Sequence, residues 1–296
     1  MFLKNVKIAQ RNKGEKMESL YQETKFLMNK YHITANKALG QNFLIDEEVI
    51  EKMIRESNIS KEDLIIEIGP GLGALTKHLL ENAKKVICIE LDQKMLNILN
   101  DRFQQYDNFE LIHDDILKID LNQLIQQQSF QNVKVVANLP YYITTPIIMK
   151  LLEERIELQS ITVMVQKEVA QRLSAAPGGK FSGAVTYTVD YYAECTQIIE
   201  VPRNSFLPSP DVDSAVIKLE LRKEPKVKVM NEELFFKVIK ASFMQRRKTL
   251  INGLVSAGLI KTKDEANIIL EQIGLNEKVR GEDLTIEQFA ILSDKL

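Results

Sequence analysis

Short apolar runs alternate with segments of helical periodicity between about residues 46 and 166. The apolar runs have the length of buried strands, and they are Leu64–Gly69, Val86–Asp92, Phe109–Asp115, Val133–Leu139 and Ile161–Gln166. Between them, residues 74–82 and 94–105 repeat apolar positions every three or four residues, as amphipathic helices do. This alternation predicts an α/β fold, in which a parallel sheet carries helices on both faces.

The pattern changes towards the end of this region. Residues 212–221 alternate polar and apolar side chains and predict a further strand, after a turn region marked by Pro202, Pro208 and Pro210. Gly183–Tyr192 fits either a strand or a helix, and the pattern leaves both possibilities open.

From residue 225 the periodicity is wholly helical, with segments at about 232–252, 262–273 and 285–295. Asn231 is a good N-cap for the first of them. We therefore predict three parts, which are a polar, basic N-terminal extension over residues 1–33, an α/β domain over 34–224 and a helical domain over 225–296.

The composition is that of a soluble globular protein, since 45% of the residues are hydrophobic and 27% are charged. Cys88 and Cys195 are far apart and lack CxxC partners, which predicts neither a zinc site nor a disulfide framework and suits a reducing cytosol. No apolar run approaches the ~18 residues of a membrane helix, and no signal peptide is evident. We expect a cytoplasmic protein without a membrane partner.

The formal net charge of −2 hides a strong segregation of charge along the chain. Residues 1–37 carry +5 and residues 222–263 carry +8, whereas residues 38–221 carry −10 and the last 33 residues carry −5. An acidic body flanked by basic segments can bind a polyanion such as a nucleic acid. The alternative, that these charges are only solvated faces, stays open on charge alone.

The N-terminal extension also bears on where translation begins. Gly14-Glu15-Lys16 can be encoded by a stretch that resembles a bacterial ribosome-binding site, directly before Met17. We therefore hypothesise that Met17 is the native start.

A glycine-rich turn, Gly69-Pro70-Gly71-Leu72-Gly73, follows the first predicted strand. Glycines are needed where the backbone turns tightly and approaches a ligand without an intervening Cβ. Glu90 ends the second strand, 21 residues after Gly69, where its carboxylate can accept hydrogen bonds from ribose hydroxyl groups. The pattern fits a nicotinamide dinucleotide as well as S-adenosylmethionine, and a tight turn without a ligand is the remaining alternative.

Two further groups end later strands. Asp114-Asp115 follows the third strand, where a carboxylate can accept a hydrogen bond from an adenine amino group, although such a pair is often only a helix cap. Asn138-Leu139-Pro140-Tyr141 ends the fourth strand. Because ligands of open α/β sheets bind at the carboxyl ends of the strands, we expect these groups to converge on one crevice.

The Asn-Leu-Pro-Tyr sequence suits methyl transfer to an exocyclic amine, whose lone pair is delocalised into the base. The Asn138 side-chain oxygen and the Leu139 carbonyl can accept the amine hydrogens and turn the lone pair towards the methyl donor. Pro140 fixes φ and helps to present that carbonyl, and the Tyr141 ring can stack on a flipped-out base. Positioning and desolvation then suffice without a strong general base. A turn with a packed tyrosine is the structural alternative.

Together these motifs resemble the ribosomal RNA adenine N6,N6-dimethyltransferase family, in particular its bacterial small-subunit (16S) branch. The matching stretches cover nearly the whole chain, and they are residues 38–44, 69–74, 90–92, 138–141, 166–173, 208–210, 212–216 and 245–250. The resemblance implies a Rossmann-like class I methyltransferase sheet and S-adenosylmethionine as the cofactor. It implies a cofactor site formed by Asn42, Leu44, Gly69, Gly71, Glu90, Asp115 and Asn138. It also implies that Phe181 lies opposite Tyr141 across the target base.

The main alternative within this resemblance is the erythromycin-resistance methyltransferase, which modifies a large-subunit adenine. Its motif usually has isoleucine where this chain has Leu139, and residues 245–248 and 280–284 look more like the small-subunit enzyme. The resemblance thus implies N6,N6-dimethylation of two adjacent adenosines in a hairpin loop near the 3′ end of 16S rRNA. It also implies a role in assembly of the small subunit or its precursor. We expect a monomer.

The sequence disfavours two other classes of protein. A non-catalytic RNA-binding or assembly factor would keep the fold without the chemistry, which the intact Asn138–Tyr141 motif disfavours. A nicotinamide oxidoreductase is disfavoured because nothing after Glu90 supplies a partner for hydride transfer. His32, His78 and His113 lack the spacing of metal ligands, and we expect no metal.

A basic stripe is predicted on the helix that starts at Asn231. At about 100° per residue, one arc of that helix holds Lys237, Lys240, Arg247 and Lys248. We expect this stripe to follow the phosphates of a folded RNA, with a solvated helix face as the alternative. Arg246 points to the apolar side, where we expect a structural ion pair or a domain-interface role.

Overall fold

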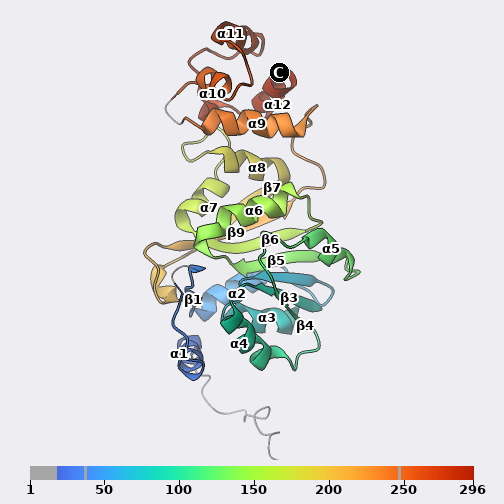
Figure 1. Cartoon of the computed structure of the whole chain (residues 1–296), viewed down its shortest axis with the longest axis vertical. Helices are drawn as coiled ribbons and strands as arrows, with labels where there is room; N and C mark the ends of the chain where they lie inside the picture. The colour runs from blue at the N-terminus through green and yellow to red at the C-terminus, as the bar shows by residue number, and fades with distance from the viewer. Residues whose placement is uncertain (1–18, 37–38, 246–247) are drawn as a thin grey trace, which may run out of the picture.

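The computed structural model describes residues 19–36, 39–245 and 248–296. Met17, the hypothetical start, lies outside these ranges. Arg246 and Arg247 also lie outside them, so the structure does not describe the roles predicted for these two arginines. Within these ranges the chain forms a seven-stranded sheet, a two-stranded sheet and helices on both sides of the larger sheet (Figure 1). Among the described helices, none is both long enough and apolar enough to cross a bilayer.

The large sheet has the strand order β4-β3-β2-β5-β6-β9-β7. From β4 to β6 the neighbouring strands are parallel, whereas β9 is antiparallel to both β6 and β7. The strands are β2 (Leu64–Ile68), β3 (Lys85–Glu90), β4 (Phe109–His113), β5 (Val133–Asn138), β6 (Ser160–Gln166), β7 (Ala193–Val201) and β9 (Ser214–Leu221). Every predicted strand is present within about two residues of its expected bounds, and the Rossmann-like α/β fold is confirmed.

Two hydrophobic clusters cover the two faces of this sheet. The first includes residues of α1 (Leu20–Lys30), α2 (Glu47–Glu56), α3 (Ala74–Asn82) and α4 (Gln93–Phe103). The second includes residues of α5 (Leu121–Gln126), α6 (Thr144–Glu153), α7 (Lys167–Leu173) and α8 (Ala184–Tyr192). Ile65 belongs to the first cluster and Ile66 to the second, because alternate side chains of a strand point to opposite faces. Burial on both faces explains the near-continuous apolar character of the central strands.

The sequence pattern missed β7 and left α8 undecided. Strand β7 forms an edge of the sheet, and only its end residues, Ala193 and Val201, are buried, so its apolar signal is weak. Helix α8 buries its tyrosines against the C-terminal helices, as the 5.2 Å between the ring centroids of Tyr191 and Phe235 shows.

The N-terminal extension contains a folded helix, α1, which the weak pattern of the first 33 residues did not predict. Ser19 and Gln22 form a capping box at its start. Thr24 and Leu27 are the buried residues of the helix, so its apolar stripe is narrow. Glu23 forms an ion pair with Arg102, which docks α1 on α4.

In the described part of the chain, four helices follow β9, namely α9 (Glu232–Phe243), α10 (Leu250–Ser256), α11 (Lys263–Gln272) and α12 (Ile286–Asp294). They lie beyond α8, at the opposite end of the molecule from α1 (Figure 1). The cluster that contains α6 to α8 continues into these helices without interruption. The side chain of Asn231 caps α9, as predicted, by accepting a hydrogen bond from the Leu234 N–H at 3.0 Å. The predicted boundary after residue 224 falls in the segment between β9 and α9.

The single helix predicted over residues 232–252 is wrong, because α9 ends at Phe243. Helix α10 instead packs closely against α9, and a Cβ on Gly253 would lie 2.5 Å from the Ala241 carbonyl oxygen. Leu254 is fully buried in the core that the two helices share. The turn is therefore imposed by tertiary packing, and neither glycine nor proline marks it in the sequence.

Replacing Gly253 by alanine distinguishes this packing from a continuous exposed helix. We expect Gly253→Ala to lower the free energy of unfolding by about 1–2 kcal/mol, since the cost of overpacking exceeds the gain in helix propensity. Urea unfolding followed by circular dichroism measures the change, with the exposed Ser256→Ala in the same helix as the control. Stabilisation by Gly253→Ala would contradict the close crossing.

Candidate active site

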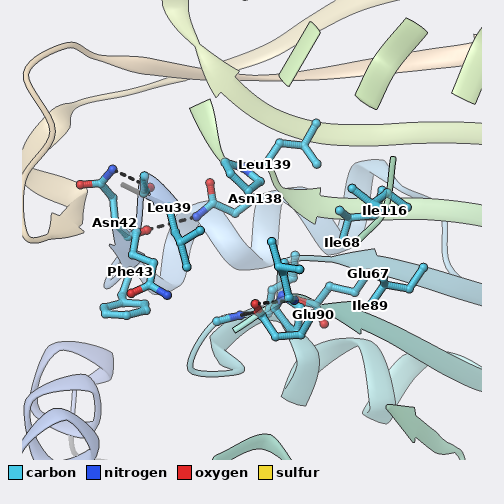
Figure 2. Close-up of a pocket in the computed structure, with 18 of the residues that line it drawn as sticks. Leu39, Asn42, Phe43, Glu67, Ile68, Ile89, Glu90, Ile116, Asn138 and Leu139 are labelled. Atoms are coloured by element: carbon cyan, nitrogen blue, oxygen red, sulfur yellow. Dashed lines mark hydrogen bonds between the residues drawn. The ribbon is translucent and has the colours of Figure 1, made fainter. Parts of the chain in front are cut away.

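A pocket at the carboxyl ends of β2, β3 and β5 brings together all of the predicted cofactor-binding residues and most of the predicted catalytic ones (Figure 2). The predicted cofactor residues all line it, namely Asn42, Leu44, Gly69, Gly71, Glu90, Asp115 and Asn138. Leu139, Pro140 and Tyr141 line it as well. The expected convergence at one sheet edge is therefore present, although roles in binding and catalysis do not follow from placement alone.

The glycine turn owes its shape to left-handed backbone conformations. Gly69, Gly71 and Gly73 have φ values of 65°, 58° and 82°. At Gly73 packing also requires glycine, because a Cβ would lie 2.4 Å from Cε2 of Phe103. The turn leads directly into α3, and the first N–H groups of a helix have no partner within the helix and can bind a ligand.

Glu90 is held at the pocket by backbone hydrogen bonds. Its Oε1 accepts the N–H groups of Leu91 and Asp92, both at 2.9 Å, and its Oε2 accepts that of Gly71 at 3.3 Å. Burial raises the pKa of the carboxyl group, and the three backbone donors oppose that shift. Each carboxylate oxygen has two acceptor sites, so Oε2 retains one for a ligand hydroxyl group.

Asp115 both caps a turn and lines the pocket, the two possibilities that the sequence left open for the Asp114-Asp115 pair. Its Oδ1 accepts the Leu117 N–H at 3.0 Å, which is a capping interaction, and its Oδ2 lies 3.5 Å from Lys118 Nζ. Asp114 Oδ1 in turn accepts the Asp115 N–H at 2.7 Å. Both aspartates nevertheless line the pocket, so capping fixes a carboxylate that also borders the ligand space.

Residues 39–44 close another side of the pocket. They are held there because β1 (Phe43–Leu44) pairs with β8 (Phe206–Leu207) in the two-stranded sheet. Gln41 Nε2 also donates a hydrogen bond to Asp92 Oδ2 at 2.8 Å. The N-terminal segment is thereby fixed to the same sheet edge that carries Glu90.

The Asn138 side chain has a defined orientation. Its Nδ2 donates to the Asn42 main-chain carbonyl at 3.4 Å, as Figure 2 shows. A carbonyl can only accept, so this bond directs the amide NH₂ group to Asn42 and leaves Oδ1 available as a hydrogen-bond acceptor. The Asn138 amide oxygen is thus a hydrogen-bond acceptor at the edge of the pocket.

The residues after Asn138 are also restrained. Pro140 has φ −61°, and its carbonyl oxygen accepts the Thr144 hydroxyl at 3.0 Å. The Tyr141 hydroxyl forms a hydrogen bond with Ser214 Oγ on β9, and burial raises the pKa of the phenol. This bond ties the tyrosine to the antiparallel part of the sheet.

Two exposed aromatic rings differ in their relation to the pocket. Tyr142, which the sequence analysis did not single out, lines the pocket and is 51% exposed. Phe181 is equally exposed but lies in the connection between α7 and α8 and does not line the pocket. The lining of this pocket does not test whether Phe181 faces Tyr141 across a base, so its role stays a prediction.

Glu67 is a pocket residue that the sequence reasoning missed, although an acid within the apolar run of β2 was a signal. Its side chain is buried and accepts hydrogen bonds from Thr76 Oγ1 at 2.6 Å and Cys88 Sγ at 3.4 Å. Burial raises the pKa of Glu67 to about 7.

Among the described residues, no group of three or more His, Cys, Asp or Glu side chains is arranged to hold a metal ion.

The predicted basic stripe does not lie along one helix. Lys237 and Lys240 are on α9, where they pair with Glu233 at 2.6 Å and Glu153 at 3.9 Å. Lys248 lies in the connection to α10, because α9 ends earlier than expected. The three lysines are exposed, and their contact with RNA stays a prediction.

Comparisons with known proteins identify the family of the chain. A model of the ribosomal RNA adenine dimethylase family matches residues 32–296. A relative called Ribosomal RNA small subunit methyltransferase A, from Clostridium botulinum (strain Langeland), is 51% identical over 271 residues, covering 92% of this chain and 97% of its own. A protein of the same name from Bacillus licheniformis is 49% identical over 279 residues, covering 92% and 95%.

Solved structures share the architecture. A dimethyladenosine transferase from Plasmodium falciparum has a TM-score of 0.70 and 28% identity, covering 84% of this chain and 95% of that one. The 23S rRNA methyltransferase ErmE has a TM-score of 0.66 and 24% identity, covering 86% and 99%, and supports the fold alone. The fold is that of a class I methyltransferase. The chain belongs to the ribosomal RNA adenine dimethylase family, and its activity is that of an rRNA adenine dimethyltransferase.

Because Glu67 is buried, we expect the free energy of unfolding to depend on pH. Its pKa rises from 4.5 to about 7 on folding, so the protein loses stability as pH increases through that range. Glu67→Gln mimics the protonated group and does not titrate. We expect the unfolding free energy of wild type to fall relative to this variant by roughly 3 kcal/mol between pH 4.5 and pH 8. Urea unfolding across this range measures the difference, and a constant difference would contradict the assignment.

Proposed function

We propose that this protein uses S-adenosylmethionine to dimethylate N6 of two adjacent adenosines in a hairpin loop near the 3′ end of 16S rRNA. The orientation of Asn138 carries the chemical part of the proposal, because its amide oxygen is left free beside the predicted cofactor site. The choice of the small subunit is supported by relatives of that name at about half identity over nearly the whole chain.

The residues of the pocket fit this cofactor. Glu90 retains an acceptor for ribose hydroxyl groups, Asp115 offers a carboxylate to the adenine amino group, and Gly69 and Gly71 leave room for close backbone approach. Asn42 and Leu44 would cover the cofactor from the N-terminal segment. When bound, S-adenosylmethionine supplies an electrophilic methyl group.

The chain itself orients the amine. Asn138 Oδ1 and the Leu139 carbonyl accept the N–H groups of adenine N6, which turns the nitrogen lone pair away from the ring. Tyr141 stacks on the flipped-out base, and we assign the facing ring to Phe181. This chemistry relies on positioning and on exclusion of water rather than on a strong base.

The substrate is 16S rRNA within the small subunit or its precursor, and the protein acts as a cytoplasmic monomer that also takes part in subunit assembly. Four basic residues contact RNA phosphates, and they are Lys237, Lys240, Arg247 and Lys248. This proposal leaves no role for a nicotinamide cofactor.

Asn138→Ala tests the proposed chemistry. Losing the amide acceptor is expected to lower tritiated methyl transfer to small-subunit rRNA by about 10²-fold or more, the scale found when one transition-state hydrogen bond is removed. The exposed Asn97→Ala on α4 is the control and should retain wild-type transfer. Large-subunit rRNA is assayed in parallel. Full transfer by Asn138→Ala would refute the mechanism, and wild-type labelling of large-subunit rRNA alone would refute the substrate.

A further inference from the structure

Arg102 on α4 connects two segments that border the pocket. Its Nη1 donates a hydrogen bond to the Leu72 carbonyl oxygen, inside the glycine turn. Its Nη2 donates to the Glu23 carboxylate on α1. The guanidinium also lies 4.9 Å from the centroid of the Phe103 ring, the side chain that excludes a Cβ at Gly73.

Both contacts of Arg102 lead to the pocket wall. Leu72 itself lines the pocket from the glycine turn. Thr24, the neighbour of Glu23, lines it from α1 and is 3% exposed. The side chain of Arg102, in the last turn of α4, thus joins the glycine turn to the N-terminal helix.

The chemistry of the bridge makes arginine the suitable residue. A planar guanidinium can bond two acceptors in different directions at once, which an ammonium on a single stem does less well. The Arg102 side chain is 13% exposed, and burial lowers its pKa while the charge of Glu23 opposes that shift. The carboxylate therefore stabilises a cation whose second hydrogen bond fixes the turn.

We propose that Arg102 is a positioning residue that shapes the cofactor pocket by holding the glycine turn and α1 together. This inference rests on the proposed function in one respect, namely that the pocket binds S-adenosylmethionine. Arg102 touches no reacting atom, so the bridge affects affinity for the cofactor and leaves the rate at saturation unchanged.

Arg102→Met keeps the aliphatic stem against Phe103 but removes both hydrogen bonds. We expect its Kd for S-adenosylhomocysteine, measured by calorimetry, to rise about tenfold, the scale of one lost charged hydrogen bond. The KM for S-adenosylmethionine should rise in parallel, with kcat at saturating donor unchanged. Adding Glu23→Gln to Arg102→Met should weaken binding no further, because Glu23 acts through Arg102.

Asp101→Asn is the matched control. Asp101 lies at the surface of α4, where it pairs with Lys30 of α1 at 3.3 Å and accepts a hydrogen bond from the Tyr31 hydroxyl. This variant should bind S-adenosylhomocysteine like wild type. Hydrogen exchange of the unliganded protein is a second readout, in which the backbone amides of Gly69 and of residues 71–73 should exchange faster in Arg102→Met but not in Asp101→Asn.

These measurements separate the inference from the proposed function. Failure of wild type to bind S-adenosylhomocysteine would contradict the proposed cofactor, and hydrogen exchange would still decide the role of the bridge. Unchanged Kd and unchanged exchange in Arg102→Met would overturn the inference. Equal weakening by Asp101→Asn would also overturn it, because docking of α1 in general would then be the cause.

Discussion

The whole site depends on one carboxylate, that of Glu90, and on the backbone groups that it binds. It accepts the N–H of Gly71 in the glycine turn and those of Leu91 and Asp92 at the entrance to α4. These bonds join the ends of β2 and β3 and compensate part of the cost of burying the carboxylate. The turn and the carboxylate that face the ligand are therefore fixed before any ligand arrives.

The amine side of the site is connected to this edge through the N-terminal segment. Asp92 accepts a hydrogen bond from Gln41, and the neighbouring Asn42 carbonyl accepts the Asn138 amide. A continuous series of contacts thus runs from the Glu90 carboxylate to the Asn138 amide, the group proposed to receive the substrate amine. Residues 39–44, a segment of low regularity, thereby connect the two sides of the proposed site.

Much of the architecture was predictable because its signals are local or follow from sheet topology. Strands buried on both faces form continuous apolar runs, and the ends of parallel strands must meet at one edge, which brought Gly69, Glu90 and Asn138 together. The edge strand β7 was missed because it is half exposed. The end of α9 at Phe243 was missed because contact with Gly253, rather than a local breaker, imposes it.

The contributions of α1 were the least predictable part of the site. The helix buries few residues, and its ion pair joins Glu23 to a partner 79 positions away. Contacts of that range leave no periodic trace in a single sequence. The same holds for the bond between Tyr141 and Ser214, which are 73 positions apart.

The most direct measurement is mass-spectrometric mapping of methylated nucleosides in small subunits that lack these methyl groups, after incubation with the protein and S-adenosylmethionine. The account predicts N6,N6-dimethyladenosine at two adjacent positions near the 3′ end of 16S rRNA. Methylation of any other nucleoside in its place, or no methylation of these subunits, would contradict it.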